Sequence, residues 1–260
     1  MECNNCKNQN AKSSIQKIIG VMSGKGGVGK STVTVMLADS LLNHGYKVGI
    51  FDADISGPSI PSLLNINEKL LQGNEEEIYP YETEKGLKIV SMNLMMDDVN
   101  QPVIWRGSIL SNVIQQFWKK VIWGDIDYLL IDMPPGTSDV ALTVLQQIHP
   151  NTMIMVSIPQ EMVQMIVHKS IEMVNKMNIK MLGLILNMSY YICPCCNEKF
   201  RLYHEKSDSV NPYRVLAELP ATIDVADIAN NQGILTDSLQ ELIDPVTHII
   251  TEEIKINTYL

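Results

Sequence analysis

The sequence predicts an α/β fold, a doubly wound and mostly parallel β-sheet flanked by helices. Three observations lead to this prediction. Apolar runs of strand length alternate with helical patterns, as in sheets whose parallel strands are joined by crossover helices. Two of these runs end in aspartate, and carboxylates at strand ends mark the ligand-binding edge of such sheets. The first run leads into a glycine-rich loop that is followed by a helix.

The glycine-rich loop reads Gly24-Lys25-Gly26-Gly27-Val28-Gly29-Lys30-Ser31-Thr32, between an apolar run at 17–22 and a helical pattern at 31–44. Its spacing fits the phosphate loop of P-loop NTPases. Glycines let successive backbone N–H groups surround phosphate oxygens, and the helix directs its positive end at the same anion. We expect Lys30 to reach the β- and γ-phosphates of ATP and the Ser31 hydroxyl to ligate Mg²⁺.

Lys25 is a second lysine inside this loop, and an ordinary phosphate loop does not need it. The variant resembles the deviant Walker A motif of the ParA, MinD, nitrogenase iron protein and Mrp ATPases. In that group the first lysine reaches across a dimer to the partner's nucleotide, and the resemblance implies this role for Lys25. The spacing alone leaves open a solvated lysine at the tip of a loop.

Two later strands carry carboxylates at their ends. The run at 46–51 leads into Asp52-Ala53-Asp54, and the run at 128–132 ends at Asp132 in the form of a Walker B strand, whose carboxylate holds the Mg²⁺ shell. The acidic segment at 67–86 is expected to be an irregular surface excursion. The other expected elements are strands at 87–92, 153–158 and 180–186 and helices at 108–121, 139–148, 161–177 and 238–256, the last of which Pro245 can kink or split.

Length and composition suit one large domain. The chain has 260 residues, of which 45% are hydrophobic and 19% charged. We expect a flexible polar tail at 1–14, followed by an ATPase domain at 15–260 with an inserted cysteine loop near 190–205. No apolar run approaches a membrane span of about 20 residues, and the N-terminus lacks the regions of a signal peptide, so a cytoplasmic protein is expected. The net charge of -9, without a dense basic patch, disfavours nucleic acid and anionic membrane as partners.

Five cysteines fall in two clusters, the pair Cys3 and Cys6 and the triplet Cys193, Cys195 and Cys196. Such clustering in a cytosolic protein indicates metal or redox chemistry before disulfides. Two thiolates on one turn suit an iron–sulfur cluster, zinc or Cu(I). A cubane cluster usually takes four cysteines, which a two-fold dimer would supply. Zinc stays open on the residues alone, because the N-terminal pair could complete a four-cysteine site; that pair could equally hold a second cluster, assist transfer or be inert.

In content and order these motifs resemble the Mrp family, also called ApbC, of iron–sulfur cluster carrier ATPases. The resemblance covers nearly everything from residue 15 onward. Its most specific features are Asp-Met-Pro-Pro-Gly-Thr and the Cys-x-x-Cys that follows Asn-Met-Ser-Tyr. Besides the phosphate loop it rests on 52–61, 105–107, 127–139, 158–160, 186–190 and 193–196. The chain departs from the family pattern at 201–213, where a glycine stretch is common, and modestly at 219–224.

The resemblance implies a protein that binds and hydrolyses ATP with Mg²⁺, holds a 4Fe-4S cluster at the interface of a homodimer and transfers it to apo iron–sulfur proteins. The alternative is a positioning or partition ATPase of the MinD or ParA kind without a cluster, but the acidic C-terminal helix and the cysteine loop argue against it. A third hypothesis is a zinc module that uses nucleotide only structurally. By position, the resemblance implies that Asp54 orients the attacking water and that Asp132 is the Walker B carboxylate. It implies that 134–139 is switch II and that Asn187 reads the base. Cys193 and Cys196 are implied to ligate the cluster, with Cys195 at the variable position between them.

Overall fold

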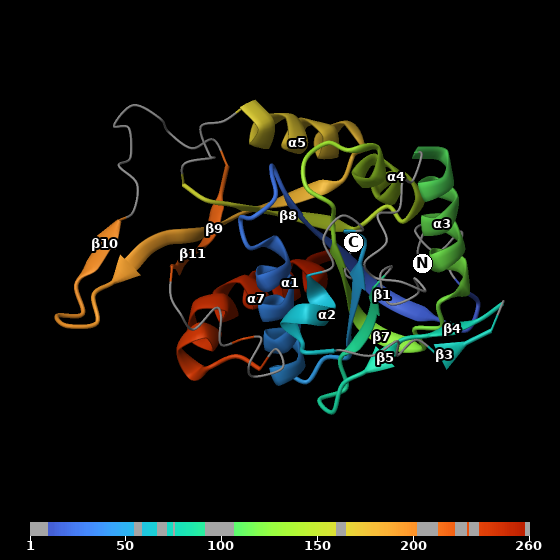
Figure 1. Cartoon of the computed structure of the whole chain (residues 1–260), viewed down its shortest axis with the longest axis horizontal. Coiled ribbons are helices and arrows are strands. Elements are labelled where there is room, and N and C mark those ends of the chain that lie inside the picture. The colour runs from blue at the N-terminus through green and yellow to red at the C-terminus, as the bar shows by residue number, and fades with distance from the viewer. Residues whose placement is uncertain are drawn as a thin grey trace.

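A central, mostly parallel sheet with helices on both faces forms the body of the computed structural model, which confirms the predicted fold class (Figure 1). The structure describes residues 10–54, 59–66, 72–74, 76–91, 107–159, 165–201, 213–221, 228 and 234–257. The strand order is β10-β9-β8-β1-β7-β2-β6-β5, and β11 pairs with β9. Cys3, Cys6, residues 55–58, 92–106, 160–164 and 202–212 lie outside the described residues, and so does most of 222–233.

The strands and helices follow one another much as the apolar patterns predict. The strands are β1 (Ser14–Ser23), β2 (Val48–Asp52), β3 (Gln72–Gly73), β4 (Ile78–Tyr79), β5 (Tyr81–Glu82), β6 (Lys88–Ser91), β7 (Asp125–Asp132), β8 (Thr152–Ser157), β9 (Lys180–Ile192), β10 (Lys199–Arg201) and β11 (Val215–Pro220). The helices are α1 (Lys30–Asn43), α2 (Ile60–Leu63), α3 (Gly107–Lys120), α4 (Asp139–Gln147), α5 (Met165–Lys176) and α7 (Asp237–Asn257).

The central strands are buried on both faces, which is why they read as continuous apolar runs rather than alternating ones. Strand β1 pairs in parallel with β7 and β8, and β2 pairs in parallel with β7 and β6. In the β2/β7 register Asp52 lies opposite Asp132. The aspartates that end these two strands therefore meet at the same carboxyl edge of the sheet.

Two hydrophobic cores lie on opposite sides of the sheet. One joins the sheet to α1, α2 and α7, and the other joins it to α3, α4 and α5 (Figure 1). Apolar side chains of one strand alternate between the two cores, as Ile19 and Val21 do against Ile18 and Met22 on β1. This double burial fixes the edge at which the glycine loop and both aspartates emerge.

Helix α7 is one continuous helix although Pro245 stands inside it. The Ser40 hydroxyl of α1 bonds Asp244 at 2.8 Å and Thr247 at 2.8 Å, on either side of the proline. The amide of Gln240 donates to Ser40 Oγ at 3.0 Å as well. Because α1 holds α7 on both sides of the missing N–H, the helix is neither split nor ended there.

Two segments differ from what the patterns suggest. The acidic stretch at 67–86 contains the short strands β3, β4 and β5, two of which pair as a separate ribbon. Strand β9 runs six residues beyond the predicted end at 186, and β10 folds back on it as a hairpin. Before β1, Asn10 Nδ2 donates to the Lys119 carbonyl at 3.0 Å, and the Trp123 N–H donates to Ser13 Oγ at 2.9 Å.

Among the described residues, none of the helices has the length and apolar character needed to cross a membrane.

Candidate functional site

The glycine loop joins β1 to α1 in a conformation that glycine makes possible. Gly27 and Gly29 have φ of 82° and 83°, in the left-handed region that residues with a Cβ rarely adopt. A Cβ on Gly29 would lie 2.2 Å from Asn187 Nδ2, so a side chain there would also collide with β9. Gly29 is the N-cap of α1 and offers no side chain to its first turn. The N–H groups of that turn are thus left to an anion.

Lys30 and Ser31 meet Asp132 directly behind this loop. Lys30 Nζ lies 2.8 Å from Asp132 Oδ1, and the Ser31 hydroxyl donates to Asp132 Oδ2 at 2.6 Å. The Thr34 hydroxyl lies 3.0 Å from Asp132 Oδ1. Asp132 is fully buried and Lys30 is 6% exposed. Three donors from the first turns of α1 therefore hold the carboxylate that ends β7.

Asp54 and Asp52 follow on the neighbouring strand. Asp54 Oδ2 lies 3.6 Å from Lys30 Nζ, so the lysine stands between two carboxylates. Asp52 accepts from the Ser91 hydroxyl at 2.9 Å and from the Asp54 N–H at 3.1 Å. Burial first, and then the charge of Asp132, raise the pKa of Asp52 to about 8.

Burial also raises the pKa of Asp132, whereas the Lys30 ammonium and the hydroxyls of Ser31 and Thr34 oppose that rise. With a cation and two hydroxyls in contact, Asp132 is the carboxylate of the pair whose charge is compensated. Asp52 accepts only a hydroxyl and a backbone N–H. We therefore assign the negative charge to Asp132 and a proton to Asp52 at neutral pH.

The loop after β7 is hydrogen-bonded to the end of β1, directly before the phosphate loop. The Gly136 N–H donates to the Ser23 carbonyl at 2.8 Å, and the Met133 N–H donates to the Val21 carbonyl at 2.9 Å. Ser138 then caps α4 through the Ala141 N–H at 3.2 Å. These bonds place the start of α4 close to the strand end from which the phosphate loop emerges.

Lys25 and Asn187 differ in how the glycine loop surrounds them. Lys25 is exposed at the tip of the loop, whereas Asn187 is buried, with 2% exposed. Asn187 Nδ2 donates to the Val28 carbonyl at 2.9 Å. The amide of Asn187 thus ties β9 to the phosphate loop, and its oxygen is the group that it could offer to the amino group of a base.

The described cysteines lie on the turn of the β9/β10 hairpin, which projects from the body of the protein (Figure 1). The Cys193 N–H donates to the Glu198 carbonyl at 2.9 Å, and the Asn197 N–H donates to the Cys193 carbonyl at 2.9 Å. Asn197 closes the turn with φ of 57°. Backbone N–H groups of Cys195 and Cys196 lower the pKa of the Cys193 thiol, which favours the thiolate that metals bind.

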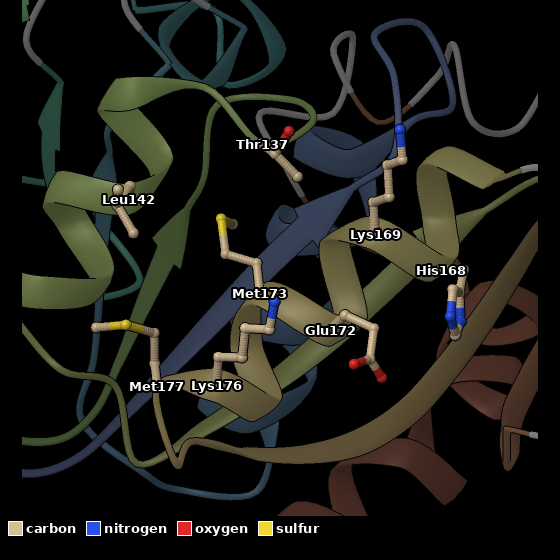
Figure 2. A pocket seen from close by; sticks show the side chains of 8 residues that line it. All are labelled: Thr137, Leu142, His168, Lys169, Glu172, Met173, Lys176 and Met177. Atoms are coloured by element: carbon tan, nitrogen blue, oxygen red, sulfur yellow. The ribbon is translucent and has the colours of Figure 1, made fainter.

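A hollow of about 540 Å³ opens between α4 and α5, beside the loop that follows β7 (Figure 2). Leu142, Met173 and Met177 supply its apolar wall, and Thr137 borders it from the loop. Its charged lining residues are Lys169, Glu172 and Lys176, all from α5. The hollow does not include Lys30 or Asp132, so it is separate from the phosphate-loop cluster.

The donor set around Asp132 fits a magnesium nucleotide. Mg²⁺ prefers hard oxygen ligands and keeps several waters, which one hydroxyl and one carboxylate can hold. Ser31 and Asp132 present that pair in direct contact. Lys30, between Asp132 and Asp54, is the cation that a triphosphate would engage.

Sequence reasoning left three polar groups of this cluster without a role. Thr34 lies one helical turn after Lys30, and its position on the inner face of α1 is the signal that could have singled it out. Asp52 was seen only as part of a strand end, and a carboxylate opposite Asp132 on the next strand could have been inferred from the register. Ser91, which bonds Asp52, ends β6 without a distinguishing pattern.

The parallel sheet, the glycine loop before α1 and the Lys30–Asp132 contact define a P-loop NTPase. A family profile described as "NUBPL iron-transfer P-loop NTPase", of the ParA group, matches residues 14–254. The chain belongs to this iron-transfer P-loop NTPase family, which confirms the resemblance stated from the sequence.

Curated relatives agree with that assignment. The chain is 45% identical over 228 residues to an iron-sulfur cluster carrier protein of Clostridium perfringens, covering 84% of this chain and 80% of the relative. It is 39% identical over 239 residues to an iron-sulfur cluster carrier protein of Methanococcus maripaludis, with 90% and 82% covered.

Solved structures show the same fold. A nucleotide-binding protein of Archaeoglobus fulgidus in complex with ADP is 37% identical, with a TM-score of 0.73 and 85% of this chain and 88% of that chain covered. The cell division ATPase MinD of Pyrococcus furiosus has a TM-score of 0.67 at 19% identity, with 91% and 99% covered, and shows the fold alone.

Proposed function

We propose that this protein is a cytoplasmic ATPase that carries a 4Fe-4S cluster at the interface of a homodimer and delivers it to apo iron–sulfur proteins. The observation that carries the proposal is the pairing of two sites in one chain: the Lys30–Ser31–Asp132 cluster and an exposed turn with three cysteines. The names of the curated relatives and the ADP bound by the Archaeoglobus protein support it.

ATP hydrolysis is assigned to the residues behind the glycine loop. Lys30 leaves its carboxylates to bind the β- and γ-phosphates, and Ser31 with Asp132 holds Mg²⁺, which neutralises phosphate charge when bound. Asp54, whose Oδ2 lies 3.6 Å from Lys30 Nζ, is assigned to orient the attacking water. Lys25, exposed at the tip of the loop, is assigned to the nucleotide of the second copy.

Asn187 is assigned to the adenine base. Its amide nitrogen already donates to the Val28 carbonyl, so the side chain is held against the loop that would carry the phosphates. The amide oxygen can accept from the exocyclic amine of adenine, which guanine lacks at that position. This gives the protein a physical reason to prefer ATP over GTP.

The cluster is assigned to Cys193 and Cys196. Among the described residues no group of three or more His, Cys, Asp or Glu side chains is arranged to hold a metal ion. Two thiolates from one turn leave a cubane with half of the four ligands it usually takes. A two-fold related copy supplies the other half, since an isologous interface presents the same patch twice.

One strand joins the two sites. Asn187 touches the phosphate loop, and six residues further along the chain lies Cys193, no more than about 20 Å away at the rise of a fully extended strand. Beyond Asn187, β9 is paired with β10 and β11, so a shift of Asn187 would be felt by the strands that carry the cysteine turn. Nucleotide exchange can therefore alter the position of the cysteine turn and with it the hold on the cluster.

The cysteine assignment is tested by anaerobic reconstitution with iron and sulfide. Cys193→Ala or Cys196→Ala should bind no stable cluster, because a dimer of either variant retains two of the four thiolates. Cys195→Ala should be mild, and a Cys3→Ala/Cys6→Ala double variant should keep the bridging cluster. Iron and sulfide per chain are measured beside ATP binding, which every variant should retain.

Two results of that experiment contradict the assignment. If the Cys193 variant keeps full iron and sulfide while the Cys3/Cys6 double variant loses both, the cluster is bound by the N-terminal pair and the assignment to Cys193 and Cys196 is wrong. Zinc without sulfide in all forms rejects the carrier function itself.

The hydrolytic assignment is tested with Asp54→Asn. ATP binding should stay within about threefold of the unmodified protein, while the hydrolysis rate falls about a hundredfold or more, because placing a water matters in the transition state and hardly in the ground state. Binding is measured by calorimetry and hydrolysis by phosphate release. Asp125→Asn, an exposed carboxylate at the start of β7, is the matched control. An equal loss of binding and rate would make Asp54 a binding residue.

A further inference from the structure

The two faces of the β9/β10 hairpin differ in chemistry. Tyr190 pairs with Arg201, Tyr191 with Phe200 and Ile192 with Lys199. Because side chains alternate along a strand, Tyr191 and Phe200 share one face, and the pairs on either side of them share the other. The hairpin therefore has one face with an aromatic pair and one face with two cations.

The cationic face is tied to the body of the protein. Lys199 Nζ lies 3.6 Å from the centroid of the Tyr190 ring. Lys199 and Arg201 both reach Glu218 on β11, at 3.8 Å and 3.6 Å. Tyr190 is buried, with 6% exposed. These contacts link both cations of the hairpin to Tyr190 and Glu218, while Ile192 on the same face is 41% exposed.

The aromatic face is open. Tyr191 is 43% exposed and Phe200 is 49% exposed, which is unusual for two large apolar side chains paired across strands. Among the described elements, the hairpin projects away from the helices that cover the sheet (Figure 1). Together the two rings expose on the order of 200 Å².

Cys193 lies on the same face. The ladder continues to Cys193, whose N–H donates to the Glu198 carbonyl, and Cys193 is two residues after Tyr191. A second chain that shares a cluster through Cys193 must approach from the side of the hairpin that carries this residue. Such an approach brings it over Tyr191 and Phe200.

We infer that Tyr191 and Phe200 form the contact through which a second copy of this chain closes over the shared cluster. The inference rests on the proposed function and adds the residues that make the seam. Four rings, two from each copy, surround the cluster with apolar surface and restrict access of water and chelators to it. The two cations of the hairpin lie on the opposite face beside Glu218, so this seam would not bring the lysine and arginine of the two copies together.

The size of the seam predicts how the dimer depends on the cluster. Four rings bury a few hundred Å², which is well below the roughly 1,200 Å² of a stable interface. The aromatic contact alone is therefore too small to hold two copies together in the absence of nucleotide. Cluster ligation and the aromatic seam must act together. Loss of the cluster should therefore dissociate the dimer, and removal of the aromatic contact should weaken cluster binding.

The test compares Tyr191→Ser/Phe200→Ser with Ile234→Ser, which removes an apolar side chain that is 46% exposed outside the hairpin. Tyr191→Phe/Phe200→Tyr is the conservative rescue. Each nucleotide-free protein is reconstituted anaerobically with iron and sulfide. Molar mass is measured by light scattering over a dilution series, and the rate of iron loss to EDTA is followed by the visible absorption of the cluster. Far-ultraviolet circular dichroism and ATP binding establish that each variant is folded.

The serine double variant should dimerise about tenfold or more weakly and lose iron to EDTA about tenfold or more rapidly than the unmodified protein, as expected for removal of central aromatic contacts. The Ile234 variant and the conservative double variant should behave as the unmodified protein does. A loaded, dimeric serine variant with an unchanged rate of iron loss overturns the inference and leaves the carrier function standing. An unmodified protein that takes up neither iron nor sulfide overturns both.

Discussion

Asp52 and Asp132 bring two carboxylates to facing positions at the ends of adjacent strands, with both side chains almost fully buried. A single ammonium, that of Lys30, contacts Asp132 directly. Two buried negative charges beside one cation are costly, so one carboxylate takes up a proton. Ser91 and the Asp54 N–H can serve a neutral Asp52 without rearrangement of the backbone, since a hydroxyl either donates or accepts.

The proton on Asp52 makes stability depend on pH. With a folded-state pKa of about 8 against an ordinary value of 3.8, the folded protein holds a proton that the unfolded chain has lost between these values. Stability therefore falls as pH rises from about 4 to about 8. Asp52→Asn removes the titrating group and keeps the shape. We expect the difference in the free energy of unfolding between this variant and the unmodified protein to be at least about 1 kcal/mol more favourable to the variant at pH 8 than at pH 5.

Urea unfolding of the metal-free and nucleotide-free proteins at both pH values measures that gain. Asp125→Asn, which alters an exposed carboxylate on β7, should show no such growth with pH. An Asp52→Asn variant whose advantage is equal at pH 5 and pH 8 would mean that Asp52 is charged in the folded protein.

At the scale of elements, the sequence predicts what is long, apolar and local. The core strands are readable as continuous apolar runs, and helices α1, α3, α4 and α5 are readable because their apolar residues recur at helical spacing. Strand β10 is exposed at all three positions, and β11 pairs with β9 through irregular register, so neither has a periodic pattern. Asn187 and Ser189 interrupt the apolar run and conceal the continuation of β9, which pairing with β10 and β11 stabilises.

The candidate site likewise has residues whose role the sequence predicts and residues whose role it does not. The closeness of Lys30 to Asp132 follows from a loop and a strand end that share the carboxyl edge of the sheet. Thr34 could be inferred from its spacing, one helical turn after Lys30. Ser91 ends β6 without a distinguishing pattern, and its contact with Asp52 is visible only once the strand register is known.

The seam between α1 and α7 provides a test at this scale. Ser40 is buried and links Asp244, Thr247 and Gln240, so Ser40→Ala leaves polar groups of α7 without their partner. We expect a loss of about 1–3 kcal/mol in the free energy of unfolding. Urea unfolding measures it, with the exposed Ser238→Ala of α7 as the matched control. An unchanged midpoint would show that α7 is held by apolar packing alone.

At the scale of the whole molecule, the nucleotide cluster and the cysteine turn belong to two different parts of one sheet. The loop after β1 lies at the centre of the strand order, whereas the hairpin extends β9 toward one edge (Figure 1). Lys25 is exposed on the loop, and on the hairpin Cys195 and Cys196 are exposed and Cys193 is half-buried. A second copy that engages both must be oriented by both, which gives nucleotide a means to bias how the hairpins meet.

Lys25→Ala tests that connection. If Lys25 reaches the nucleotide of the partner, its removal should leave ATP affinity in the single chain within about threefold and weaken ATP-dependent dimerisation about tenfold or more, since a desolvated charge–phosphate contact is lost only in the dimer. Light scattering with a non-hydrolysable ATP analogue measures dimerisation, and calorimetry measures binding. Lys47→Ala, an exposed lysine just before β2, is the matched control. Unaltered dimerisation and hydrolysis in the Lys25 variant would make this lysine a solvated side chain at the tip of the loop, and coupling between the copies would then have to pass through Asn187 and β9.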